Sequence, residues 1–99
     1  APIRVDSGRA LGRVDVELLG EGAVVTWLAR ATRGGEVLAR RISRKGGASE
    51  VVTVARTGAD RASGFPRMAS FQGTIYVAWT ESVSRQGPSR IQLARLVLE

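Results

Sequence analysis

Alternation of hydrophobic and polar residues along the chain predicts short β-strands. From residue 13, the segment RVDVELL alternates three apolar residues with Asp15 and Glu17, and this period of two is typical of a strand with one covered face. After the turn GEG, the segment AVVTWLAR is apolar at nearly every position, as expected for a strand covered on both faces. The first two elements therefore predict a layered β-structure.

The remaining segments continue this pattern. EVLARRIS, the turn RKGGAS and EVVTVAR complete a first group of four strands. After the linker TGADRASG, a second group contains FPRMASF, a turn at Gln72 and Gly73, TIYVAWTE, the loop SVSRQGPS and RIQLARLVL, which is three strands. No segment combines a helical apolar stripe with caps at both ends. The sequence therefore predicts an all-β fold.

The second group repeats the first. Trp27 and Trp79 lie 52 positions apart, and four other identical pairs keep the same spacing: Arg9 and Arg61, Ala10 and Ala62, Gly12 and Gly64, Val25 and Val77. A repeat of roughly 40 to 50 residues with four strands is the mark of a β-propeller blade, whose faces are covered by neighbouring blades. We expect a single two-blade unit over residues 1–99, with blade one at 9–56 and the first three strands of blade two at 61–98.

The second blade lacks a fourth strand, whereas residues 2–6 form an extra strand before the first blade. PIRVD at 2–6 resembles VTVAR at 52–56, and each leads into an Arg-Ala-x-Gly linker. We expect residues 2–6 of one subunit to complete the second blade of a neighbour, so that three copies close a six-bladed ring through a heterologous, cyclic interface. Four copies with eight blades is the second option. A single-chain β-sandwich with the N-terminal strand folded back is the alternative fold.

One segment carries a family resemblance. ASGFPRMASFQGTIYVAWTE, followed by SRIQLARL, resembles the C-terminal blades of bacterial sialidase-like propellers with BNR-type repeats, and the similarity covers essentially the whole chain. The resemblance implies a six-bladed fold and a secreted or periplasmic parent protein. Between the third and fourth strands, Ser43, Lys45, Gly47 and Ser49 resemble a degenerate Asp box, with lysine in place of aspartate. This turn supports the assignment of the strands to blades and does not indicate catalysis.

The resemblance does not extend to catalytic residues. Active sialidases of this kind share an arginine cluster, a tyrosine nucleophile paired with a glutamate, and an aspartate acid/base. Their F-R-I-P motif is absent here, because FPRM at 65–68 has a different order. Tyr76 lies in an apolar strand, where a buried structural ring is expected. We therefore assign no catalytic residue, and a glycoside hydrolase whose catalytic residues lie outside this chain remains an alternative function.

Charged residues in the innermost strands suggest a ligand site. Asp15 and Arg67 occupy equivalent positions there, and Arg67 with Arg13 or Arg61 predicts an anion site at the mouth of the ring, since guanidinium groups bind carboxylate or phosphate through two hydrogen bonds. The candidate ligand-binding residues are therefore Arg13, Asp15, Arg61 and Arg67, with an acidic glycan such as sialic acid as ligand. Structural roles are expected for Trp27 and Trp79 between blades and for Gly12 and Gly64 at the tight entry into each inner strand.

Composition narrows the chemistry further. The 99 residues include no cysteine and no histidine, which excludes disulfides, the usual zinc sites and the commonest general base. We expect no cofactor and no metal. The net charge of +6 is spread along the chain, so nucleic acid is a disfavoured partner. No apolar run approaches the roughly 20 residues of a membrane span, and the N-terminus lacks a signal-peptide pattern, so we expect a soluble chain with no membrane partner.

These observations predict a non-catalytic, self-assembling propeller fragment, natural or engineered, that forms a homo-oligomeric ring. A homotrimer is the first expectation and a homotetramer the second. An acidic-glycan-binding module is the alternative from a different functional class.

Overall fold

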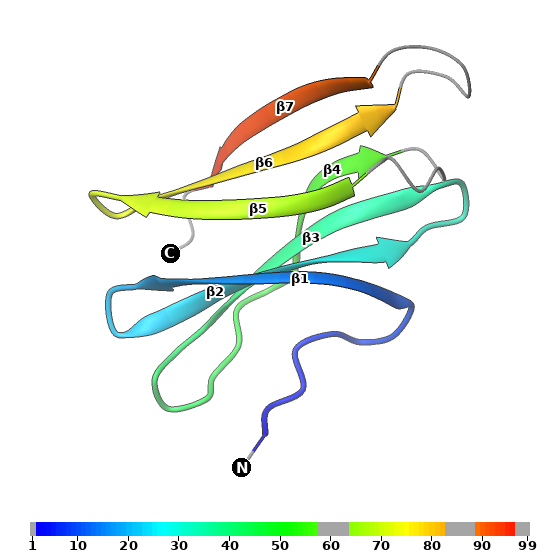
Figure 1. Cartoon of the computed structure of the whole chain (residues 1–99). Coiled ribbons are helices and arrows are strands. Elements are labelled where there is room, and N and C mark those ends of the chain that lie inside the picture. Colours follow the sequence, from blue (N-terminus) through cyan, green and yellow to red (C-terminus); the bar gives the residue numbers. More distant parts are fainter. Residues whose placement is uncertain (1, 58–63, 83–88, 97–99) are drawn as a thin grey trace.

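The computed structural model describes residues 2–57, 64–82 and 89–96, and this part of the chain forms two antiparallel sheets (Figure 1). Sheet A contains, in chain order, β1 (Ala10–Leu19), β2 (Gly22–Arg30), β3 (Gly35–Ile42) and β4 (Val52–Thr57). Sheet B contains β5 (Gly64–Phe71), β6 (Thr74–Ser82) and β7 (Ser89–Leu96). The all-β class and the division into four strands followed by three are confirmed.

The strand pairing repeats between the sheets with the spacing seen in the sequence. Six of the seven pairs of facing residues in β1 and β2 have a counterpart 52 positions later in β5 and β6, and the bulge early in the first strand recurs. For example, Val16 lies opposite Val25 in sheet A, and Met68 lies opposite Val77 in sheet B. In the next strand pair, Trp27 lies opposite Leu38 and its counterpart Trp79 lies opposite Gln92. The two sheets are therefore structural equivalents.

The bulge places large side chains in an uncommon backbone conformation. Gly12 has a φ of 88° and Arg13, which follows it, a φ of 54°. At the equivalent position of sheet B, Phe65 has a φ of 52°. Glycine adopts a positive φ without steric cost, whereas it is unusual for a bulky side chain. Arg13 and Phe65 therefore have the same strained backbone conformation at equivalent positions of the two sheets.

The hydrophobic core lies between the two sheets. The sheets contact each other most extensively along β1 and β5, which run in the same direction (Figure 1). Because side chains alternate along a strand, each sheet contributes one face to this core: Val24, Leu28, Val37 and Ala39 from sheet A, and Ile75, Val77, Trp79 and Leu96 from sheet B. The structure thus places Trp79 between two sheets.

The alternation predicted for β1 is present, but its polar side faces sheet B. Asp15 Oδ2 accepts a hydrogen bond of 2.6 Å from the Met68 amide, and Glu17 Oε1 accepts one of 2.9 Å from Ser70 Oγ. The apolar side points away from sheet B, with Val14, Val16 and Leu18 exposed by 64%, 56% and 74%. Within the single chain the polar side of β1 is therefore the side covered by sheet B, because β5 offers donors to the carboxylates.

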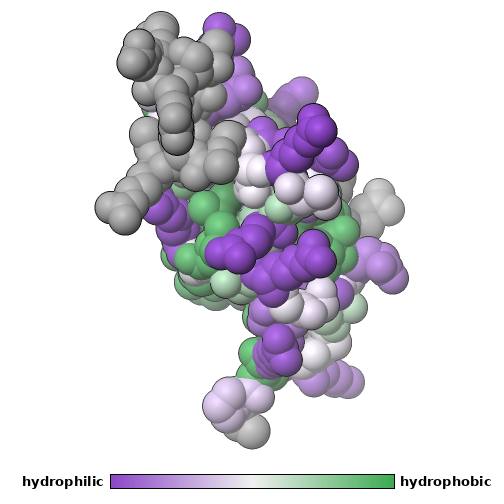
Figure 2. Space-filling model, turned by 90° about the vertical axis from the view of Figure 1, so that its right-hand side faces the viewer, coloured by the Kyte–Doolittle hydropathy of each residue, from purple (hydrophilic) through white to green (hydrophobic). Residues whose placement is uncertain are grey.

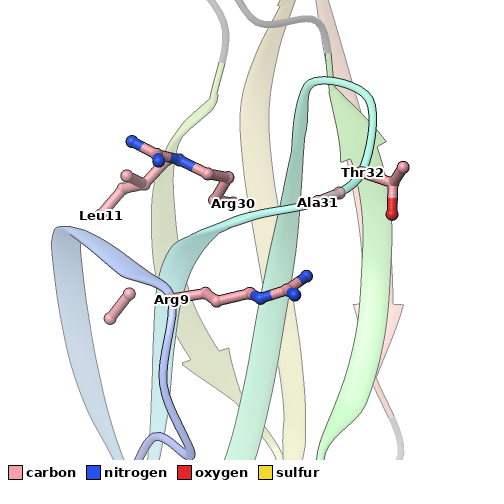
Figure 3. A pocket seen from close by; sticks show the side chains of 6 residues that line it. Arg9, Leu11, Arg30, Ala31 and Thr32 are labelled. Carbon is pink, nitrogen blue, oxygen red and sulfur yellow. The ribbon is translucent and has the colours of Figure 1, made fainter.

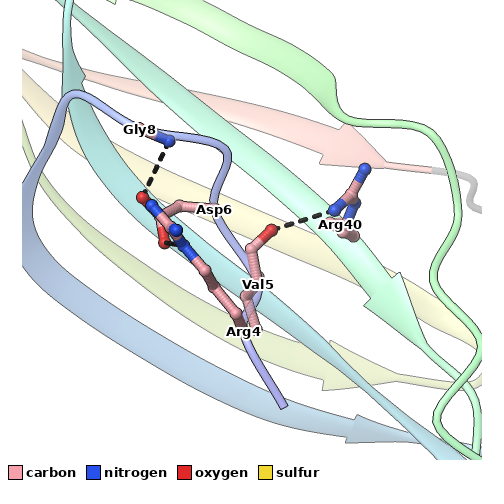
Figure 4. A network of polar contacts seen from close by, with 5 residues as sticks. All are labelled: Arg4, Val5, Asp6, Gly8 and Arg40. Carbon is pink, nitrogen blue, oxygen red and sulfur yellow. Dashed lines mark hydrogen bonds and ion pairs between the residues drawn. The ribbon is translucent and has the colours of Figure 1, made fainter.

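Residues 2–8 do not form a strand in the single chain and lie against sheet A on the side remote from sheet B. Arg40 Nη1 donates a hydrogen bond of 2.9 Å to the Val5 carbonyl (Figure 4). Val5 and Asp6 line a small pocket together with Trp27. Trp27 is only 3% exposed, so this tryptophan is buried although no second sheet covers it.

Candidate assembly surface

Each sheet has one face in the core and one face that no other sheet of the described chain covers. We call these uncovered sides the outer faces. By the pairing of the strands, the outer face of sheet A contains Val14, Val16, Leu18, Val25, Trp27, Leu38 and Arg40. The outer face of sheet B contains Arg67, Ala69, Phe71, Tyr76, Ala78, Thr80, Ile91, Leu93 and Arg95.

Both outer faces carry exposed hydrophobic side chains. On sheet B, Phe71, Ile91 and Leu93 are 64%, 72% and 65% exposed, in addition to the three residues of β1. Tyr76, for which burial was expected, is half-buried on the same face. Figure 2 shows hydrophobic surface on both sides of a central band of hydrophilic side chains. Exposed apolar patches of this kind mark interaction sites in soluble proteins.

The repeat relates each outer face to a face that is already packed. Val16, Val25 and Trp27 on the outer face of sheet A are the counterparts of Met68, Val77 and Trp79, which face the core in sheet B. In the same way, Tyr76 and Ala78 on the outer face of sheet B are the counterparts of Val24 and Thr26, which are fully buried in sheet A. The outer face of sheet A therefore corresponds to the core face of sheet B, and the outer face of sheet B corresponds to the core face of sheet A. These two core faces pack against each other inside the chain.

The edge of sheet B is also open. Among the described residues, β7 pairs with β6 alone, and it is eight residues long. An unpaired edge strand presents a row of backbone donors and acceptors to any extended chain. Residues 2–8 are a segment of similar length, and sheet pairing occupies none of them.

The three predicted ligand-binding residues that the structure describes have different surroundings. The Arg13 guanidinium lies 3.6 Å from the centre of the Phe65 ring. Asp15 accepts hydrogen bonds from the amides of Met68 and Val16, at 2.6 and 2.9 Å. Arg67 is exposed on the outer face of sheet B, and Arg61 lies outside the described residues. Asp15 and Arg67 nevertheless hold equivalent register positions, opposite Thr26 and Ala78.

Sequence reasoning did not identify a basic pocket at the start of β1 (Figure 3). This open pocket of about 640 Å³ is lined by Arg9, Ala10, Leu11, Arg30, Ala31 and Thr32. The Arg30 amide donates a hydrogen bond of 2.8 Å to the Arg9 carbonyl, which fixes the two backbones together. Their guanidinium groups point in different directions (Figure 3). The pair therefore does not form a single two-armed anion clamp.

The turn that resembles an Asp box is stabilised by its own hydrogen bonds. Ser43 Oγ accepts a hydrogen bond of 3.0 Å from the Gly47 amide, and the Ser43 amide donates one of 2.7 Å to the Gly47 carbonyl. Ser49 Oγ accepts a further hydrogen bond of 3.0 Å from the Arg41 amide. The two serines thus shape the connection from β3 to β4.

Lowering the pH is expected to loosen the N-terminal segment. A hydrogen bond of 3.2 Å from Arg4 Nε, with a second of 3.0 Å from the Gly8 amide, holds the pKa of Asp6 below its ordinary value of 3.8 (Figure 4). A carboxyl group whose pKa is lower in the folded chain stabilises the fold at higher pH and loses this contribution as the pH falls through the folded value.

The amide resonance of Gly8 should therefore titrate with a midpoint below 3.8 in an NMR experiment. Asp6→Asn is the control and should abolish this transition. A midpoint at or above the ordinary value would contradict the contacts described for Asp6.

Within residues 2–57, 64–82 and 89–96, acidic side chains do not gather in groups of three or more that could hold a metal ion. The same ranges contain no helix long and apolar enough to cross a membrane. In comparisons with protein-family models, curated proteins and solved structures, nothing matches this chain.

Proposed function

We propose that this chain is a self-assembling, non-catalytic unit of a sialidase-like β-propeller, and that its copies associate head to tail into a closed ring. The observation that carries the proposal is the pair of apolar outer faces, which correspond through the repeat to the two faces packed in the core. The outer face of sheet B in one copy covers the outer face of sheet A in the next. Such an interface is heterologous, and it forms a ring when its rotation closes.

Charge complementarity favours a second copy as the occupant of these faces. Inside the chain, the Asp15 carboxylate reaches the Met68 amide across the sheets. The repeat gives Arg67 the position of Asp15 and Val16 the position of Met68. Arg67 of one copy is thereby directed to the Val16 amide of the next, where Asp15 Oδ1 already lies at 2.9 Å. A guanidinium and a carboxylate attract at such a site, and desolvation at an interface strengthens the attraction.

The open edge supports the same arrangement. In the proposed ring, residues 2–6 pair with β7 of the neighbouring copy and supply the fourth strand of its sheet B. In the single chain the hydrogen bond from Arg40 to the Val5 carbonyl holds this segment against the outer face of sheet A, so the segment moves from this face to the edge of β7 when the neighbour's sheet B docks. The pairing would cover an edge that natural sheets rarely leave open.

The number of copies follows from the number of sheets. Each chain contains two sheets, so three chains provide the six blades that the family resemblance implies. Four chains would provide eight and form the second option. In either ring, every outer face is covered.

The mass of the protein in solution tests the proposal. Sedimentation equilibrium or native mass spectrometry should give three times the mass of the chain. This mass should not change with protein concentration above the dissociation constant of the assembly. Four times the mass would replace the six-bladed ring by the eight-bladed one. A monomer at all concentrations would overturn the proposal and favour a single-chain sandwich.

The alternative of an anionic-glycan site has weaker support from the contacts. Asp15 already accepts two amide hydrogen bonds, and Arg13 stacks on Phe65. Arg67 lies on the face that the neighbour would cover. Binding of acidic glycans, and a sialidase-like hydrolase with catalytic residues elsewhere, remain predictions from the sequence.

A further inference from the structure

Arg13 and Phe65 are equivalent residues that touch each other. Each follows the glycine at the bulge of its sheet, and their φ angles are 54° and 52°. The Arg13 guanidinium lies over the Phe65 ring, 3.6 Å from its centre. This distance is within the range of a cation–π contact. The residue at this position in sheet A thus reaches the residue at the same position in sheet B.

From this geometry we infer that Arg13 and Phe65 form a closed belt of alternating cations and aromatic rings around the inner rim of the ring. The inference rests on the proposed function. If each sheet reaches the next in the same way, Phe65 contacts Arg13 of the following copy just as Arg13 contacts Phe65 within the chain. Each ring then lies between two guanidinium groups, and each guanidinium lies between two rings.

The surroundings of Phe65 fit this second contact. Phe65 is 50% exposed although its ring holds the Arg13 guanidinium, so surface remains for another guanidinium. Phe65 is the second residue of β5, the strand of sheet B that contacts β1 most extensively. Both residues also keep a positive φ, which costs free energy for non-glycine residues and persists where the surrounding contacts fix it. Contacts on both sides of each residue would account for that strain being retained.

The chemistry of the belt is specific. Arginine is the preferred partner for stacking on an aromatic face because its guanidinium is planar and weakly hydrated. Lysine in place of Arg13 would keep the charge but lose the planar contact. Leucine in place of Phe65 would keep an apolar side chain but lose the negative face of the ring.

The test compares the dissociation constant of the assembly among Phe65→Leu, Arg13→Met and the double variant. The contact within the chain is present in both monomer and ring, so the dissociation constant reports the contact between copies. Each single variant should weaken assembly by about fivefold to thirtyfold per interface, and the double variant by less than the product of the two. Phe65→Tyr should stay within about twofold of wild type because the ring is retained.

Arg33→Gln is the matched control, because it removes one arginine from the exposed turn between β2 and β3. NMR provides a second readout: the side-chain protons of Arg13 should show a larger upfield ring-current shift in the assembly than in the diluted monomer. If wild type assembles and both Phe65→Leu and Arg13→Met have the same dissociation constant as wild type, the belt is overturned and the ring stands. If wild type does not assemble, both proposals fail.

Discussion

Leu93→Lys is expected to convert the assembly into a monomer that keeps its fold. Leu93 is 65% exposed on the outer face of sheet B, so a lysine there should change the stability of the single chain by no more than about 0.5 kcal/mol. In the proposed ring the same side chain would be covered by the outer face of sheet A, where an unpaired charge is strongly unfavourable. Val16→Lys, at a position 56% exposed on the outer face of sheet A, should have the same effect, because Arg67 of the neighbouring copy is directed to this position and would repel the added charge.

A mixture of the two variants tests the direction of the interface. Leu93→Lys leaves the outer face of sheet A intact, and Val16→Lys leaves the outer face of sheet B intact. A head-to-tail interface therefore predicts a heterodimer that grows no further, because each remaining face is blocked. Native mass spectrometry distinguishes this species from either monomer.

Thr32→Lys is the control for the added charge, because Thr32 is exposed in the turn after β2. It should leave the mass of the assembly unchanged. The head-to-tail interface would be refuted if Leu93→Lys retained the wild-type mass, or if the mixture contained monomers alone at concentrations where wild type is assembled.

Removal of residues 1–7 is expected to break the assembly and to cause precipitation. The truncation removes the hydrogen bond between Arg40 and the Val5 carbonyl and uncovers Trp27, which is 3% exposed in the intact chain. It also removes the strand that is proposed to cover β7 in a neighbour. Exposed aromatic surface and an open edge strand both promote non-specific association.

Sedimentation velocity and circular dichroism of the truncated chain provide the measurement. Removal of residue 1 alone is the matched control and should preserve the wild-type mass. A truncated chain that remained folded, soluble and monomeric would show that the N-terminal segment completes no sheet in another copy.

The strands and the repeat were predictable because they depend on local patterns. Two tryptophans 52 positions apart predicted a register that the strand pairing reproduces, since the same turn lengths fix the same pairing. The orientation of β1 was not predictable in this way. Alternation shows that Val16 and Glu17 lie on opposite sides, but the covered side depends on the Ser70 hydroxyl and the Met68 amide, which come from another sheet.

The contact between Arg13 and Phe65 was also beyond sequence reasoning, although a signal was present. Both residues follow a glycine at equivalent places in the repeat, Gly12 and Gly64. Their chemical types differ, so a search for identical residues passes over them. A comparison of each position with its counterpart for complementary chemistry, which paired Asp15 with Arg67, would have identified this pair if it had included cations with aromatic rings.

The two unlike outer faces have a consequence for how the protein can fail. A head-to-tail contact has no built-in limit, and only the angle between successive copies makes the chain of contacts return to its start. In the proposed ring, a substitution that tilts β5 against β1 by a small amount would leave every contact attractive while preventing closure. The product would then be an open polymer. Fibrous aggregates rather than unfolded monomers are therefore the expected result of a mild substitution at the contact between β1 and β5.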